Sequence, residues 1–183
     1  VALRVTPVTI NAGSIGDNYW RTSRFGGGPV AALRQEQGLT GGPGRQRDRG
    51  VGLSAGYEMQ GLSADIGVTP LGFEYSNLVG GLRLNGAINR SAGTWYSLDL
   101  SRRAVTDSLL SFAGARDNRT DQRWGAVTSN GLAGQIGADN GDYGVYAYGS
   151  WHKLVGHNVR SNTRTEAGAG IYWNLVRESD RQL

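Results

Sequence analysis

The chain has 183 residues and a formal net charge of +4 at pH 7, and 30 of its residues are glycine, more than twice the usual share of about 7%. It contains no cysteine, which excludes disulfides, thiolate metal sites and a cysteine nucleophile. No apolar stretch approaches the roughly 18 to 20 residues of a membrane-spanning helix, and no charged-then-apolar leader opens the sequence, so we exclude a helical membrane protein and expect a mature segment or an excised piece.

A period of two residues is the strongest pattern, and it predicts β-strands. After a lead-in or first strand in residues 1–18, a strand is expected near 19–33. The odd positions from Val51 to Met59 are apolar and the even positions are small or polar, and the same alternation resumes from Leu62 to Thr69. A two-residue turn at 60–61 would put both apolar sets on one side. The predicted pairs are Met59 with Leu62, Tyr57 with Ala64, Ala55 with Ile66, and Leu53 with Val68.

Further strands are predicted over 78–88, 94–104, 123–139 and 164–176. Asn140 and Gly141 predict a second two-residue turn. Closing it pairs Ala138 with Tyr143, Ile136 with Val145, and Gly134 with Ala147. No window has a convincing 3.6-residue period, so helices are expected to be short and local.

The connections between these strands alternate strictly between short and longer ones. They are 34–50, 60–61, 70–76, 89–93, 105–122, 140–141 and 156–163. In an up-and-down meander every second connection lies at the same end, so one end has tight turns and the other has large loops, as in bacterial outer-membrane barrels. Five tryptophans near strand ends resemble the aromatic girdles of such barrels: Trp20, Trp95, Trp124, Trp151 and Trp173. The pattern predicts an all-β, antiparallel, up-and-down transmembrane barrel with roughly eight strands in this chain.

The inward face of such a barrel is rich in glycine and serine, which fill little volume. The larger inward candidates are Glu58, Asp65, Arg83, Asp99, Gln135, Tyr146, Tyr148, His152, Glu166 and Tyr172. These side chains could line a water-filled passage. Alternatively, the glycines only permit strand curvature, and the charges pair with one another in a filled interior.

Three segments carry a resemblance to a known family. They are SADIGVTPLGF at 63–73, RRAVTDSLLSFAGARD at 102–117 and NTRTEAGAGIYW at 162–173. They resemble signatures of the C-terminal domain of cellulose synthase operon protein C, the outer-membrane exporter of bacterial cellulose. The three segments also occur in the same order as in that family. The resemblance implies a closed barrel of about sixteen strands, preceded by a periplasmic superhelix of tetratricopeptide repeats. With roughly eight strands, this chain looks like the first half of such a barrel.

On this resemblance, we expect a pore in the bacterial outer membrane that exports a linear β-glucan, by resemblance cellulose, from the periplasm to the cell surface. The implied partners are this glucan, outer-membrane lipid, the periplasmic repeat region and an inner-membrane cellulose synthase complex, with no cofactor, metal or nucleic acid. The expected lumen contacts are Tyr146, Tyr148, Tyr172, Glu58, Asp65, Arg83, Asp99 and Glu166. A gating loop is expected to involve Arg102, Arg103, Asp107, Arg116 and Asp117, although these charges could instead only fix the loop by hydrogen bonds.

Two other functions stay open. The chain could be a complete eight-stranded outer-membrane barrel that acts as an anchor or scaffold without transport, or a soluble β-sandwich that binds glycans. An enzyme ranks last, because His152 and His157 stand alone and no nucleophile, base and orienting group converge in the sequence.

Overall fold

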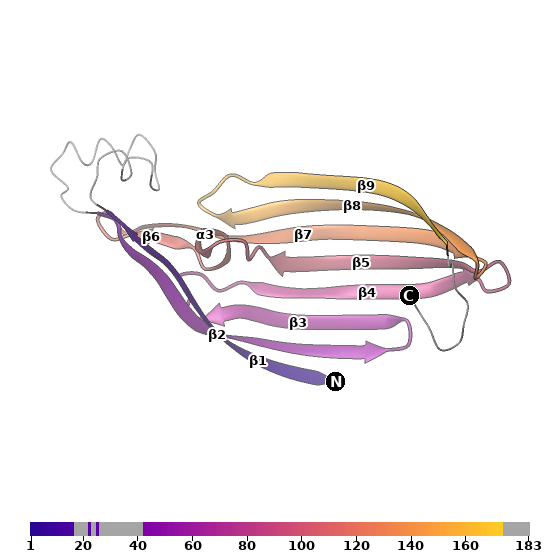
Figure 1. Ribbon diagram of the computed structural model, residues 1–183. Coiled ribbons are helices and arrows are strands. Elements are labelled where there is room, and N and C mark those ends of the chain that lie inside the picture. The colour runs from indigo at the N-terminus through magenta and orange to yellow at the C-terminus, as the bar shows by residue number, and fades with distance from the viewer. Residues whose placement is uncertain (17–21, 23–24, 26–41, 174–183) are drawn as a thin grey trace.

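A computed structural model describes residues 1–16, 22, 25 and 42–173. Eight of its strands form one antiparallel sheet in the order β1-β2-β3-β4-β5-β7-β8-β9, with the short β6 paired to β7 (Figure 1). Their bounds are β1 Ala2–Ile15, β2 Gly44–Met59, β3 Leu62–Leu71, β4 Leu78–Asn89, β5 Thr94–Ala104, β6 Ala115–Asp117, β7 Gln122–Asp139, β8 Tyr143–His157 and β9 Asn162–Trp173. One short helix, α3, spans Leu109–Phe112. The predicted all-β, up-and-down architecture is confirmed.

The two ends of the sheet differ, as the connection lengths predicted, but the predicted strict alternation fails at the last connection, because 158–161 is no longer than 90–93. We call the end with connections 60–61, 90–93 and 140–142 the short-turn end, and the end with connections 16–43, 72–77, 105–121 and 158–161 the long-loop end. Among the described residues, β1 pairs only with β2 and β9 only with β8, so both are edge strands. No described helix has the length and apolar character needed to cross a membrane.

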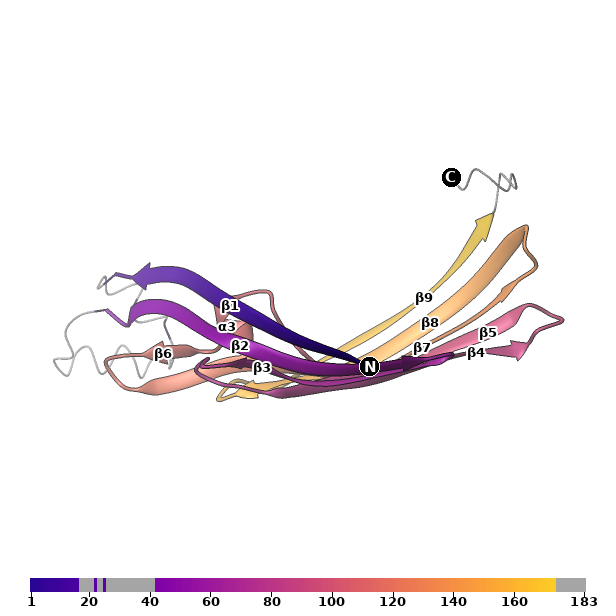
Figure 2. The same ribbon diagram turned by 90° about the horizontal axis from the view of Figure 1, so that it is seen from below.

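The register gives the sheet one apolar and one polar face, because cross-strand partners project to the same side. The apolar face includes Ile66, Leu82, Leu98, Leu132, Ile136, Val145 and Ile171, and all seven side chains are exposed. The polar face includes Glu58, Asp65, Arg83, Asp99, Gln135, Tyr148 and Glu166. The sheet is curved, and α3 lies on its concave side (Figure 2). In the part of the chain that the structure describes, no second sheet covers either face, so the fold is not a sandwich.

The small hydrophobic core lies under α3. Phe73, Leu109 and Ala113 form it, and Val8 and Ile10 of β1 pack against it. Val8 lies on the same face as Arg4, which pairs with Ser54 on the polar face, so α3 covers part of the polar, concave side near the long-loop end. The rest of the sheet is a single layer.

The first predicted hairpin is confirmed pair by pair, because all four predicted pairs around the 60–61 turn occur. The second predicted register is wrong. Ala138 pairs with Val145 and Ile136 with Ala147, which shifts the partner strand by two residues. The Asn140 side chain accepts hydrogen bonds from the backbone N–H groups of Asp142 and Tyr143, and this longer turn moves the first pair to Asp139 and Gly144. A shift of two residues keeps each side chain on its face.

Other boundaries also differ from the predictions. Residues 44–50, expected as a loop, begin β2, and the expected lead-in or first strand in 1–18 contains β1. The strand expected near 19–33 falls almost entirely outside the described residues, as do Trp20 and the predicted strand end at 174–176. Of the predicted girdle, Trp151 and Trp173 lie on the apolar face. Trp95 instead faces the polar side, because it pairs with Gly137 in the row of Tyr146.

Candidate functional site

The polar, concave face brings together all eight residues that we expected as lumen contacts. One row crosses the sheet through the pairs Glu58–Ser63, Ser63–Arg83, Arg83–Asp99, Asp99–Ala133, Ala133–Ser150 and Ser150–Glu166. Asp65 lies in the next row toward the long-loop end, opposite Gly56 and Gly81. Tyr148, Tyr146 and Tyr172 lie toward the short-turn end, on the same face. The strand register alone therefore assembles these residues from β2, β3, β4, β5, β8 and β9.

Three tyrosines of this face each lie over a glycine of the neighbouring strand. A Cβ atom at Gly168 would stand 2.6 Å from the Tyr148 ring, and one at Gly170 would stand 2.6 Å from the Tyr146 ring. Gly144 lies under the Tyr172 ring in the same way. Glycine permits this close approach because it has no side chain. Each ring therefore has one side against backbone and its other side toward the concave space.

Two of these rings form a continuous aromatic surface. The Tyr146 and Tyr148 ring centroids lie 6.5 Å apart with an angle of 23° between the ring planes. Tyr172 is held at the short-turn end by a hydrogen bond from its hydroxyl to the Asp139 carboxylate. Aromatic faces of this kind can pack against the apolar C–H surface of a sugar ring.

Ion pairs neutralise most of the charge on the polar face. Arg103 reaches across Gly81 of β4 and donates to both carboxylate oxygens of Asp65, at 2.5 and 2.6 Å. Arg83 donates to its direct cross-strand partner Asp99 at 3.2 Å. A third pair joins Arg164 and Glu166 at 2.5 Å. The face is therefore rich in hydrogen-bonding groups but carries little unpaired charge, which suits a neutral ligand.

The residues expected in a gating loop fall into two groups. Arg102 and Arg103 lie within β5 and not in the loop, and their side chains project to opposite faces of the sheet. Arg103 belongs to the polar face, which the alternation Ser97, Asp99, Ser101 could have indicated. Asp107 is exposed, directly before the N-cap residue of α3.

The loop between β5 and β7 is fixed by hydrogen bonds and ion pairs. Asp117 is buried and accepts hydrogen bonds at 3.0 and 2.9 Å from the equally buried Arg119 guanidinium. Arg116 pairs with Asp121 at 2.6 Å. The Ser108 hydroxyl accepts a hydrogen bond from the Ser111 N–H in a capping box that starts α3. Sequence reasoning missed Arg119, whose role depends on a local turn.

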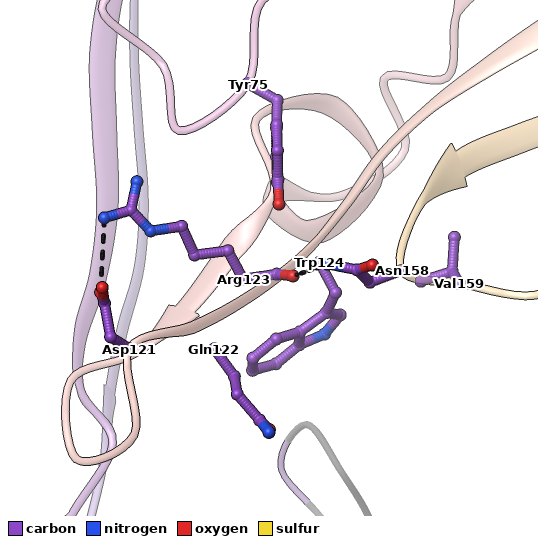
Figure 3. A pocket seen from close by; sticks show the side chains of 7 residues that line it. All are labelled: Tyr75, Asp121, Gln122, Arg123, Trp124, Asn158 and Val159. Atoms are coloured by element: carbon purple, nitrogen blue, oxygen red, sulfur yellow. Dashed lines mark hydrogen bonds and ion pairs between the residues drawn. The ribbon is translucent and has the colours of Figure 1, made fainter.

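A cavity of about 650 Å³ lies at the long-loop end, and sequence analysis did not predict it. Its lining comprises Tyr75, Asp121, Gln122, Arg123, Trp124, Asn158 and Val159 (Figure 3). Arg123 extends toward Asp121, and the Asn158 amide donates to the Arg123 backbone oxygen at 2.8 Å (Figure 3). The Arg123 guanidinium also contacts Glu74 at 2.6 Å.

Two arginines, Arg123 of the cavity lining and Arg116 outside it, lower the pKa of Asp121. Desolvation raises the pKa of the Asp121 carboxyl, but the charges of Arg116 and Arg123 and their hydrogen bonds outweigh it and hold this pKa below its ordinary value. Tyr75, on the same cavity, stacks on His157 with ring centroids 4.0 Å apart. Among the described residues, no group of three or more acidic or histidine side chains could hold a metal ion.

Comparison with known proteins gives one consistent family. The family model described as the C-terminus of cellulose synthase operon protein C matches residues 1–183. A cellulose synthase operon protein C from Pseudomonas fluorescens (strain SBW25) is 47% identical over 96% of this chain, and its counterpart from Xanthomonas axonopodis pv. citri (strain 306) is 37% identical over 97%. A third, from Salmonella typhimurium, is 33% identical over 75% of the chain. The chain spans 13% of the length of the first two relatives and 12% of the third.

Proposed function

The chain belongs to the family of the C-terminal region of cellulose synthase operon protein C, and we propose that it forms part of the wall of an outer-membrane pore that exports a linear β-glucan, cellulose. The observation that carries this proposal is the division of a single-layer sheet into an exposed apolar face and a concave polar face. A soluble domain buries its apolar face in a core, whereas a barrel wall turns that face to lipid and its polar face to the lumen.

The apolar face supports a membrane location for this wall. Ile66, Leu100 and Ile136 are each 57 to 61% exposed, and they lie on three different strands. Tyr143 and Trp173 lie on the same face at the short-turn end, as in an interfacial aromatic girdle. By the general layout of outer-membrane barrels, the short turns face the periplasm and the long loops face the cell exterior.

A wall in lipid must be closed, because unpaired backbone groups are costly in hydrocarbon. We therefore propose that β1 and β9 pair with further strands of a larger barrel, as the family resemblance of about sixteen strands implies. The glucan enters already polymerised, so this region supplies a conduit and no chemistry. The periplasmic repeat region and the inner-membrane synthase that would deliver the chain belong to the same proposal.

The polar face suits a sliding neutral polymer. The tyrosines offer flat surfaces to the pyranose rings, and the paired charges offer hydrogen bonds that replace those of water. Because six charges of this face already have partners in the Asp65–Arg103, Arg83–Asp99 and Arg164–Glu166 pairs, none of these six holds a particular sugar tightly. Weak and repeated contacts permit movement.

The test replaces Tyr146 and Tyr148 with alanine in the full-length protein. We expect extracellular glucan to fall at equal barrel abundance, because the continuous aromatic surface is lost. The matched control is Tyr143→Ala, which removes a tyrosine of the same strand from the apolar face and should leave secretion unchanged. Unchanged secretion in the double variant would contradict the contact assignment.

We propose that the loop between β5 and β7 narrows the lumen near the cell exterior. Its anchoring by Asp117 and by the core under α3 supports a fixed constriction over a moving gate. Deleting residues 108–120 from the full-length protein should then raise single-channel conductance without changing the frequency of closures. Loss of closures at unchanged open conductance would instead identify the loop as a gate.

A further inference from the structure

A short polar row crosses the apolar face near the long-loop end. It consists of Arg102 in β5, Asn130 in β7, Lys153 in β8 and Thr163 in β9, which are consecutive cross-strand partners. The adjacent row toward the short-turn end contains Leu100, Leu132 and Trp151. Lys153 is the only lysine in the sequence. Two cations therefore stand on the face that the proposed function turns toward lipid.

The depth of this row matches a membrane interface. Ten residues separate Lys153 from Tyr143, at the opposite end of the same strand. At about 3.4 Å per residue and a strand tilt of about 40°, this distance projects to roughly 26 Å along the membrane normal, close to the apolar band of about 25 Å in such barrels. Trp151 lies one row closer to the short-turn end than Lys153, at the depth where aromatic residues are enriched at a membrane interface.

The Arg102 guanidinium is held in place without being neutralised. Its Nε donates to the Leu78 backbone oxygen at 2.8 Å, and one terminal nitrogen donates to the Asn130 side-chain oxygen at 2.7 Å. The Asn130 amide nitrogen in turn donates to the Lys153 backbone oxygen at 3.2 Å. Among the ion pairs of the described residues, none involves Arg102 or Lys153. An arginine has five N–H donors, so several remain for a ligand.

We propose that this row binds the phosphate of a lipid in the leaflet at the long-loop end. The inference rests on the proposed membrane wall, and it adds a binding site on the outside of that wall. The fixed Arg102 presents the planar donor geometry that matches phosphate, Lys153 adds a point charge, and the Thr163 hydroxyl adds a further donor. Leu132 and Trp151 contact the acyl chains of the same lipid. Phosphate is favoured over a protein carboxylate because the row borders a broad apolar surface suited to those chains.

The test measures lipid retention by the full-length protein in detergent, using native mass spectrometry with diphosphoryl lipid A. Wild-type protein should retain this lipid at least about tenfold more strongly than the double variant Arg102→Ala and Lys153→Ala, because two charge-assisted contacts are lost. Lys153→Arg should retain it. The matched control is Arg160→Ala, which removes a cation from the loop at the same end. Diacylglycerol, which has acyl chains but no phosphate, should bind equally to all variants.

Equal retention of diphosphoryl lipid A by the wild type and the double variant would overturn the lipid site. Lys153→Ala alone provides a variant that we expect to fold, because among the described contacts only the Lys153 backbone oxygen takes part in a hydrogen bond and its side chain forms no ion pair. Folding is checked by heat-dependent gel mobility. If the wild type stays folded and monomeric without detergent or lipid, the membrane wall itself is wrong. If the wild type inserts into lipid but the wild type and the double variant retain diphosphoryl lipid A equally, the lipid site alone is wrong.

Discussion

Removing Arg103 distinguishes a water-filled lumen from a filled barrel interior. Arg103→Ala leaves the Asp65 carboxylate without its bidentate partner. In this sheet the two side chains are 48% and 36% exposed. For a solvent-exposed pair, the loss should be about 0.2–1 kcal/mol of unfolding free energy, near the upper end because the geometry is bidentate. In a dry, filled interior the same change would leave a buried, unpaired charge and cost about 3–5 kcal/mol.

The assay is urea unfolding of the full-length protein in detergent, followed by tryptophan fluorescence. Arg164→Ala serves as the matched control, because the Arg164–Glu166 pair lies on the same face and is 65% and 47% exposed. Both variants should lose about 1 kcal/mol or less. Adding Asp65→Ala to Arg103→Ala completes a double-mutant cycle that isolates the pair. A loss of 3 kcal/mol or more in Arg103→Ala alone would refute the water-filled lumen.

Three further predictions follow from the same wall. Leu98→Arg places a charge on the apolar face near the bilayer midplane and should lower the free energy of unfolding by about 2–4 kcal/mol. Ser97→Arg on the polar face should lower it far less, and unfolding in lipid bilayers measures both values. Asp117→Ala leaves its buried arginine partner unpaired, so the loop should become sensitive to protease and the barrel should lose roughly 3 kcal/mol; an unchanged cleavage pattern would show that another contact holds the loop. Gly168→Ala should push the Tyr148 ring off the wall and lower glucan secretion at equal abundance, and a secretion rate equal to that of the wild type would show that the ring position is not critical.

The sequence predicted the fold well where local turn chemistry and alternation agreed. The 60–61 turn needs a residue with positive φ, and Gly61 has a φ of +77°. Since the apolar sets on both sides of this turn also match, only one register satisfies both constraints. The strands 94–104 and 78–88 were bounded correctly within one residue for the same reason.

The second hairpin shows what a turn motif leaves out. The Asn-Gly pair at 140–141 is a strong signal for a two-residue turn, but the Asn140 side chain closes a longer turn through two backbone N–H groups. This competition between side-chain and backbone hydrogen bonds is not visible in the alternation, because a shift of two residues preserves every face.

For the candidate site, the sequence predicted the face of each residue but not the contacts between residues. The eight lining residues could be assigned to one face from alternation, because a strand alternates its side chains strictly. The contacts between them could not be assigned, because the Arg103–Asp65 pair spans an intervening strand and requires Gly81 beneath it. The cavity around Trp124 joins residues from three separate connections or strand ends, and no single window of sequence contains it.

Chemical labelling during secretion tests the central claim most directly. These 183 residues contain no cysteine, so Tyr146→Cys and Ala147→Cys each place one thiol in this region, on neighbouring positions of β8 that face opposite sides. They are introduced into the full-length protein after any cysteine elsewhere in it is replaced by serine. A water-soluble, membrane-impermeant thiol reagent should modify Tyr146→Cys quickly in idle cells and slowly while glucan synthesis is running, because the moving chain fills the lumen. The same reagent should leave Ala147→Cys unmodified in both states. Modification of Ala147→Cys, or a Tyr146→Cys thiol that stays unreactive when synthesis is idle, would contradict a water-filled glucan conduit with lipid on its outside.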